Sequence, residues 1–144
     1  MPPDETTRDL FSKRKRRIAR PASEFNTHVA VADVLRRWST PGWRWTHLPF
    51  GEHRNPVTGA RLKRMGTQVG WPDFILLSPA LLPDLSGTAH FLELKREGAK
   101  LNEFQQAFAV FCIDNGFPHF WTASFADAIN MLKAWGAVRA SVKA

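Results

Sequence analysis

The chain of 144 residues contains a single cysteine, Cys112. One cysteine forms no disulfide within the chain and builds no thiolate-rich metal site, so a disulfide-stabilised scaffold is excluded. We therefore expect a reducing compartment and a role for Cys112 as a small buried hydrophobic residue.

Long apolar runs are also lacking. No stretch approaches the roughly 18 consecutive apolar residues of a membrane span, and the N-terminus has no apolar segment of the kind a secretory signal needs. We expect a cytoplasmic protein with no membrane partner.

Acidic residues are few, with 13 Asp and Glu against 20 Lys and Arg, which gives a formal net charge of +7. This excess favours a polyanionic partner such as nucleic acid over a merely basic soluble protein, because part of it is concentrated in one run. The run consists of Lys13, Arg14, Lys15, Arg16 and Arg17.

The basic run lies in a segment with little apolar periodicity, so residues 1–22 are predicted to form a flexible basic arm. A hydrophobic content of 44% is enough for one core in a chain of this length. We expect a single domain over residues 23–140, and therefore one active site.

The predicted fold is α/β, a mixed β-sheet flanked by helices. Apolar periodicity and turn residues predict a helix from residue 23 to about 40, strands at 43–48, 74–77 and 90–94, a helix at 102–116, a strand at 117–121 and a helix at 125–135. The second and third strands form a hairpin through an apolar, proline-containing turn at 78–88, longer than catalysis requires. The crossover helix favours parallel pairing of the strands beside it. Residues 49–72 are predicted to form a functional loop.

Two acidic positions mark the ends of the predicted hairpin strands. Pro72-Asp73 lies twenty positions before Glu93 in the tripeptide Glu93-Leu94-Lys95. Side chains two apart on a strand point the same way, so Glu93 and Lys95 share a face, and the hairpin brings Asp73 toward them. Charges among so many apolar neighbours are costly unless a metal or substrate compensates them.

Carboxylate oxygens of Asp73 and Glu93, the backbone carbonyl of Leu94 and waters suit Mg²⁺ or Mn²⁺. Lys95 beside them can stabilise the transition state of phosphodiester cleavage or position the attacking water. The alternative is an ordinary turn aspartate with an exposed Glu93–Lys95 ion pair. The tripeptide alone leaves this alternative open, because Glu-X-Lys is common.

Four segments together resemble the VRR-NUC (virus-type replication-repair nuclease) family of the PD-(D/E)-X-K superfamily. They are Glu24, the run Gly-Thr-Gln-Val-Gly-Trp-Pro-Asp-Phe at 66–74, the run Phe-Leu-Glu-Leu-Lys-Arg at 91–96, and residues 98–105. The resemblance covers about residues 23–136. It implies magnesium- or manganese-dependent phosphodiester cleavage by Asp73, Glu93 and Lys95, with Glu24 and Gln105 assisting.

The two assisting residues have structural alternatives. Glu24 shares a helical face with His28 and Val31, which favours a site role, but a first-turn acid can also interact with the helix dipole. Gln105 follows Asn102 at the spacing of a capping box, a role compatible with the site.

Further candidates for DNA contact lie in the predicted loop. They are the cations Arg61, Lys63 and Arg64, with His53, and Trp71, which is placed to stack on a base. The remaining histidines show no metal-ligand spacing, so no zinc site is expected. The other tryptophans, including Trp38, Trp43, Trp45 and Trp135, are expected mainly in the core.

The leading hypothesis is a structure-selective or non-specific DNA endonuclease of phage or bacterial replication and repair. Compact members of the family are associated with dimers that cut branched DNA, so a homodimer is a possible state. The alternatives are a restriction-type endonuclease, for which no separate base-reading segment is evident, and a catalytically silent DNA-binding module of the same fold.

Overall fold

The computed structural model describes residues 23–49 and 55–144. The predicted basic arm and His53 lie outside these residues. The elements in chain order are α1 (Glu24–Trp38), β1 (Arg44–His47), α2 (Pro56–Arg64), β2 (Phe74–Leu77), β3 (Ala89–Leu94), α3 (Glu103–Asn115), β4 (His119–Thr122) and α4 (Phe125–Trp135).

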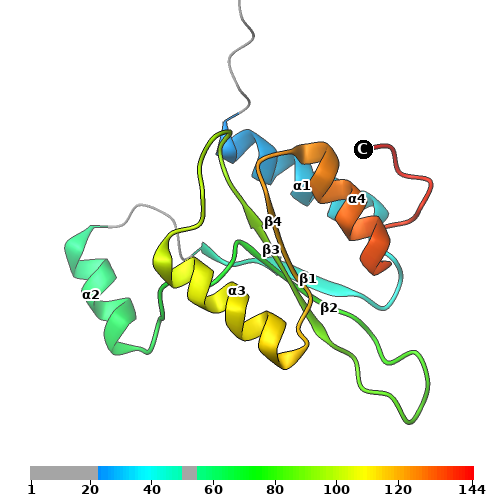
Figure 1. Cartoon of the computed structure of the whole chain (residues 1–144), viewed down its shortest axis with the longest axis horizontal. Helices are drawn as coiled ribbons and strands as arrows, with labels where there is room; N and C mark the ends of the chain where they lie inside the picture. Colours follow the sequence, from blue (N-terminus) through cyan, green and yellow to red (C-terminus); the bar gives the residue numbers. More distant parts are fainter. Residues whose placement is uncertain (1–22, 50–54) are drawn as a thin grey trace, which may run out of the picture.

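The four strands form one mixed sheet in the order β1-β2-β3-β4 (Figure 1). Antiparallel pairs join β1 to β2 and β2 to β3, and β4 runs parallel to β3 after the crossover through α3. The predicted α/β class, the hairpin and the parallel pair are confirmed.

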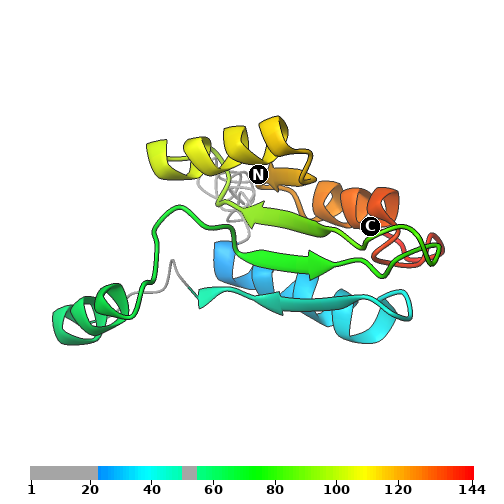
Figure 2. The same ribbon diagram turned by 90° about the horizontal axis from the view of Figure 1, so that it is seen from below.

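The prediction of a structureless loop at residues 49–72 was wrong in one part, because that segment contains α2. Asn55 caps this helix by accepting a hydrogen bond from the Thr58 amide at 2.8 Å, and Pro56 occupies its first turn, where a missing N–H costs nothing. Because α2 lies between β1 and β2, the observed order is α-β-α-β-β-α-β-α, whereas the predicted order was α-β-β-β-α-β-α. None of the residues of α2 is buried, and the helix stands apart from the sheet in both views (Figure 1, Figure 2).

Capping residues set the ends of the other helices where the sequence predicts them. The side chains of Ser23, Asn102 and Ser124 each accept a backbone hydrogen bond at the start of α1, α3 and α4. Gly116 and Gly136 end α3 and α4 with φ angles of 75° and 81°, a left-handed conformation that only glycine adopts without strain.

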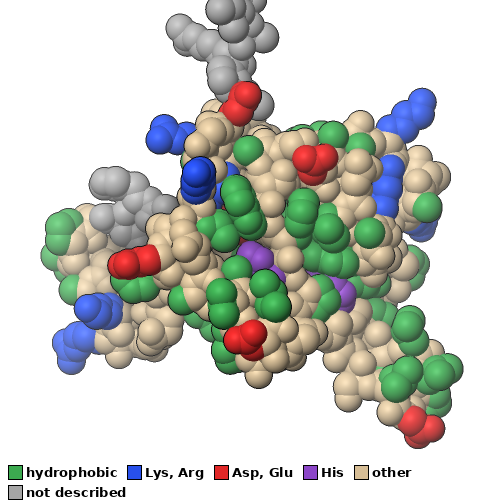
Figure 3. Space-filling model, in the orientation of Figure 1, with side chains coloured by type: hydrophobic (Ala, Val, Ile, Leu, Met, Phe, Trp, Pro, Cys, Tyr) green, Lys and Arg blue, Asp and Glu red, His purple; other side chains and the backbone are tan. Residues whose placement is uncertain are grey.

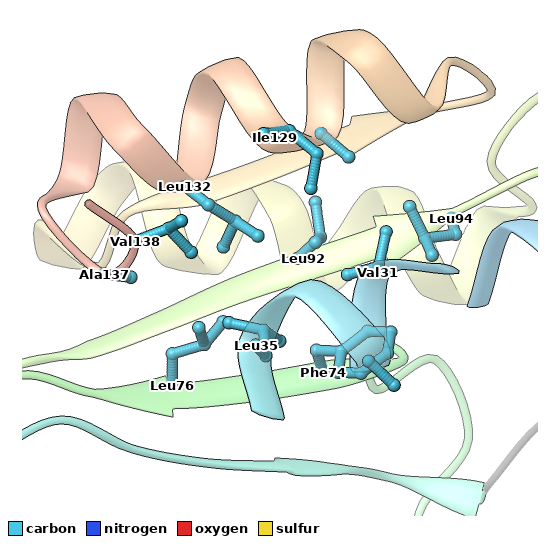
Figure 4. Close-up of a cluster of buried hydrophobic side chains, with 12 residues drawn as sticks. Val31, Leu35, Phe74, Leu76, Leu92, Leu94, Ile129, Leu132, Ala137 and Val138 are labelled. Carbon is cyan, nitrogen blue, oxygen red and sulfur yellow. The ribbon is translucent and has the colours of Figure 1, made fainter. Parts of the chain in front are cut away.

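The hydrophobic core lies between the sheet and the pair α1 and α4 (Figure 4). The two helices and the inner faces of β2 and β3 contribute Val31, Leu35, Phe74, Leu76, Leu92, Leu94, Ile129 and Leu132. Each is nearly inaccessible to solvent, and burial of such a side chain contributes about 1.5–3 kcal/mol. This core holds β3 rigidly, which positions the residues at its end.

The tryptophans divide between core and surface. Trp43, Trp45 and Trp135 pack against the core as expected, but Trp38 is 44% exposed at the end of α1. The prediction of a core position was wrong for Trp38, because the helix ends there and leaves its last turn at the surface.

The opposite face of the sheet is covered by α3 alone. Cys112 is its one buried residue, whereas Phe104 and Phe111 are 53% and 55% exposed. The helix is apolar on every side, so its periodicity could not identify the buried face. Hydrophobic atoms gather over this region and at the tip of the β2–β3 hairpin, at the lower right of Figure 3.

No helix in the described part of the chain is long and apolar enough to cross a membrane.

Candidate metal-binding active site

The register of the β2–β3 hairpin brings the two predicted metal ligands together. Phe74 pairs with Leu92, so Asp73, one position before β2, comes opposite Glu93. The Asp73 Oδ2 atom accepts a hydrogen bond of 2.7 Å from the backbone N–H of Leu94. Asp73 is therefore attached to the end of β3, as the hairpin prediction requires.

Gly70, before Trp71, and Pro72, before Asp73, both lie in closely packed surroundings. Gly70 has a φ of 85°, and a Cβ atom there would lie 2.6 Å from the carbonyl oxygen of Phe104. Pro72 is fully buried. The Gly-Trp-Pro-Asp segment is thus fixed against the start of α3, which holds the Asp73 carboxylate in place.

The Glu93 carboxylate is 4% exposed and has two donors on one oxygen. Lys95 Nζ lies 2.7 Å from Oε1, and Gln105 Nε2 donates to the same oxygen at 2.6 Å. Gln105 also completes the capping box of α3, because its Oε1 accepts from the Asn102 amide at 3.0 Å. The capping box predicted for Gln105 is confirmed, and its contact with Glu93 is compatible with the predicted site role, which stays a prediction. The exposed ion pair considered as an alternative is excluded by burial.

Burial raises the pKa of Glu93, and the negative charge of Asp73 raises it further. Lys95 opposes both effects, but the pKa still reaches about 7. The Asp73 and Glu93 carboxylates thus lie close together, and the positive charge nearby does not offset the cost of ionising both.

This charge imbalance fits a divalent cation. The N–H and C=O of one strand residue point to the same side, so the Leu94 carbonyl faces the same way as the amide that binds Asp73. Two carboxylates and one carbonyl suit Mg²⁺ or Mn²⁺, which keep several waters. No group of three or more His, Cys, Asp or Glu side chains suited to a metal occurs within residues 23–49 and 55–144.

Glu24 joins the site from α1 without being buried. Its Oε2 atom accepts a hydrogen bond of 3.2 Å from the backbone N–H of Arg96, which follows Lys95. The prediction that Glu24 continues the buried stripe was wrong, because the first turn of α1 projects past the core and leaves this residue exposed. It nevertheless lies at the same end of β3 as the two carboxylates.

Two histidines contact Asp73, although their spacing in the sequence gave them no predicted role in the site. His28 Nε2 lies 3.5 Å from Asp73 Oδ2, and His47 Nδ1 lies 2.9 Å from the Asp73 carbonyl oxygen. Burial acts to lower the pKa of His28, but the hydrogen bond and charge of Asp73 outweigh it and raise the pKa above its usual range. The signal for His28 was its spacing of four residues from Glu24.

The predicted DNA-contacting residues of α2 lie outside the acidic site, because α2 stands apart from the sheet (Figure 1). Arg61, Lys63 and Arg64 are exposed on α2, with Lys and Arg side chains visible at its end in Figure 3. Trp71 is 39% exposed, and one side of its ring packs on Phe108 at a centroid distance of 4.9 Å. Base stacking by Trp71 stays a prediction.

Comparison with known proteins supports the fold. No family model matches the chain, and a search of curated proteins finds no match. Among solved structures, the chain is similar to one described as "VRR_NUC domain protein", with a TM-score of 0.58 and 19% sequence identity over 79% of this chain and 88% of that chain. The likeness confirms the VRR-NUC-like fold expected from the sequence and, at this identity, extends no further.

The raised pKa of Glu93 yields a prediction about metal-free protein. Replacing Asp73→Asn removes one of the charges that raise the pKa of Glu93, so this pKa should fall below about 7 in a ¹³C NMR titration with EDTA. Asp84→Asn, in the exposed hairpin turn, is the matched control and should leave it unchanged.

The same shift predicts how stability depends on pH. A carboxyl whose pKa is higher in the folded chain favours the folded state below its ordinary pKa, and this contribution is lost as pH rises to about 7. Glu93→Gln should remove this loss from urea unfolding curves between pH 4.5 and 7. An identical pH dependence in wild type and Glu93→Gln would contradict the assignment.

Proposed function

We propose that this protein is a Mg²⁺- or Mn²⁺-dependent DNA endonuclease that hydrolyses phosphodiester bonds and selects branched or junction DNA. The observation that carries the proposal is the Lys95 ammonium, 2.7 Å from the buried Glu93 carboxylate and beside Asp73. Two acids and one cation at a strand end combine a metal site with a group that stabilises developing negative charge.

Each side chain has a separate task in this proposal. A bound divalent cation would polarise the phosphate and lower the pKa of a water. Gln105 holds the Glu93 carboxylate in one orientation, and the Leu94 amide does the same for Asp73. Lys95, held close to Glu93, places its charge where the phosphate becomes more negative during attack. Glu24, tied to the Arg96 amide, assists at the open side.

The choice of DNA as substrate rests on charge and on the fold. The net charge is +7, and α2 carries Arg61, Lys63 and Arg64 with no acidic residue. The solved structure with a similar fold bears a VRR_NUC domain. Selection of branched DNA, and a role in phage or bacterial replication and repair, follow from the resemblance seen in the sequence.

Substitution at the site separates cleavage from binding. Asp73→Ala and Glu93→Ala should abolish cleavage of supercoiled and branched DNA with Mg²⁺ or Mn²⁺ while leaving DNA binding intact or tighter, because each removes a negative metal ligand. Lys95→Ala should slow the chemical step by about a hundredfold or more with little change in metal affinity.

The control for these variants is Asp84→Ala, in the exposed turn between β2 and β3. Undiminished turnover after Asp73→Ala or Glu93→Ala would overturn the proposal. Binding without cleavage by the wild type, with either metal and on hairpin, flap, four-way and linear DNA, would favour the silent binding module. Cleavage at one base sequence in every substrate would favour the restriction-type enzyme.

The salt dependence of DNA binding tests the basic segments. Each phosphate contact to duplex DNA contributes about 0.9 to the slope of log affinity against log salt. Replacing Arg61, Lys63 and Arg64 by alanine should reduce this slope by up to about 3, and removing residues 1–20 by up to about 4. Fluorescence anisotropy measures the slope, with Asp73→Ala in every protein to prevent cutting.

The matched control replaces Arg139 and Lys143, exposed cations beyond α4, with alanine. A slope unchanged by the α2 substitutions would reject α2 as a DNA contact. An unchanged slope after truncation would favour a solubility tail or protein-docking segment.

We further propose a homodimer that buries the outer side of α3. Phe104, Val110, Phe111 and Ile113 are each more than half exposed there. A helix that is apolar on all sides is normally covered, and most symmetric oligomers pair the same patch on two copies. The exposed apolar surface of α3 suits such pairing.

Sedimentation equilibrium tests the dimer. Ile113→Glu should weaken self-association by about tenfold or more, because it places a charge in the apolar interface. Val57→Glu, equally exposed on α2, should have no effect. A monomer at all concentrations, or a dimer insensitive to Ile113→Glu, would contradict the proposal.

A further inference from the structure

A pocket of about 400 Å³ opens between α1 and the edge of the sheet, directly beside the metal-binding carboxylates. We call it the α1–β1 pocket. Glu24 and Asp73 line it at the acidic site, and Arg36 lines it twelve residues further along α1. A helix rises about 1.5 Å per residue, so the pocket follows α1 for roughly 18 Å.

The walls of the pocket between these charged ends are mainly apolar. Phe25, Val29 and Ala32 line it from α1 and Phe74 lines it from the sheet, and the imidazole rings of His28 and His47 complete the lining. Phe25 is 73% exposed and Val29 is 42% exposed, whereas Phe74 is buried. An aromatic ring and an aliphatic side chain thus remain exposed to solvent along a concave surface with a rigid floor.

The phenyl ring of Phe25 packs little against residues 23–49 and 55–144, since it is 73% exposed. Phe25 follows the apolar spacing of α1, but the helix projects past the core at its first turn and leaves the ring outside. A ring exposed beside a phosphate-cleaving site has the properties of a stacking platform, because a base of any sequence has a flat apolar surface.

Charge determines which part of a nucleotide fits. Asp73 and Glu24 repel a phosphate near the acidic end unless a bound cation intervenes, whereas a neutral base meets no such repulsion. Arg36 lies at the other end, 2.8 Å from Asp33 in an exposed pair. Exposed pairs are weak, so the guanidinium can exchange Asp33 for a DNA phosphate.

We propose that the α1–β1 pocket binds the base of one unpaired nucleotide next to the scissile phosphate, with Phe25 as the stacking platform and Arg36 as the contact to a phosphate further along the strand. The proposal rests on the function proposed above, which places the scissile phosphate at Asp73 and Glu93. It deepens that function by naming the feature of the substrate that the site selects.

The size of the pocket suits a single base. Its volume lies at the small end of the range of about 300–1,000 Å³ typical of sites for single small molecules. A base enters only where it is unpaired, as in a flap, a junction, a single strand or a flipped nucleotide. Selection of branched over linear duplex DNA then follows from local unpairing at the cut position.

Binding without metal tests the pocket separately from catalysis. In EDTA, Phe25→Ala should bind a single-stranded oligonucleotide about tenfold more weakly than wild type, as loss of one base–aromatic stack predicts, and linear duplex equally well. Leu81→Ala, which removes an exposed apolar side chain from the hairpin, is its control. Arg36→Ala should weaken binding of the single strand, and Arg37→Ala, the same charge change on an exposed neighbour, should not.

Cleavage with Mg²⁺ provides the second test. Two flap substrates carry an abasic site, one on each side of the mapped cut. The wild type should cleave one of these two substrates about tenfold more slowly than the intact flap, because the base that stacks on Phe25 is missing. Phe25→Ala should cut the abasic and intact substrates at equal rates, because the stack is already absent.

The outcomes distinguish the two proposals. Equal loss of single-strand and duplex binding in Phe25→Ala, or the same abasic effect in Phe25→Ala and wild type, would overturn the pocket and leave the nuclease intact. Absence of cleavage by wild type on every substrate would overturn the nuclease, and the binding measurements in EDTA would still decide whether the pocket takes an unpaired base.

Discussion

The burial of the Glu93 carboxylate at the end of β3 is the constraint on which the site depends. A buried charge is stable only when its oxygens are hydrogen-bonded and its charge is compensated. Lys95 and Gln105 both reach one Glu93 oxygen, and Asp73 is held nearby by the Leu94 amide. The negative charge of Asp73 adds to the effect of burial and raises the pKa of Glu93 further. The chain thus maintains a charge imbalance that costs stability, as expected at a site that binds a cation.

The central residues of this site could be predicted from the sequence because they depend on local geometry. Strand alternation puts Glu93 and Lys95 on one face, and a short hairpin register places Asp73 opposite Glu93. The site role of Gln105 was implied by the family resemblance, and its capping-box spacing predicted its second role. The contact of His28 with Asp73 joins α1 to the segment before β2, and the spacing of His28 from Glu24 indicated its helical face but not its partner.

The parts of the fold that were predicted wrongly have different causes. The helix α2 has only nine residues, buries none of them and contains Gly59, which suggests a loop. Its cap, Asn55 followed by Pro56, was the remaining signal. In α3 the difficulty is opposite. Apolar residues surround the helix, so periodicity identified the helix but not the side that faces the sheet.

Two of the exposed apolar surfaces, those of α3 and of the α1–β1 pocket, differ in shape. The exposed side chains of α3, such as Ile113, lie on a convex helix, where apolar surface is covered most readily by another folded surface. Phe25 and Val29 instead line a concave pocket with a rigid floor, which a second helix cannot enter but a single flat ring can. Their position beside Asp73 connects the pocket to the charged site. The part of a substrate that contacts them must be apolar and flat and must lie close to a phosphate, a combination that an unpaired nucleotide provides.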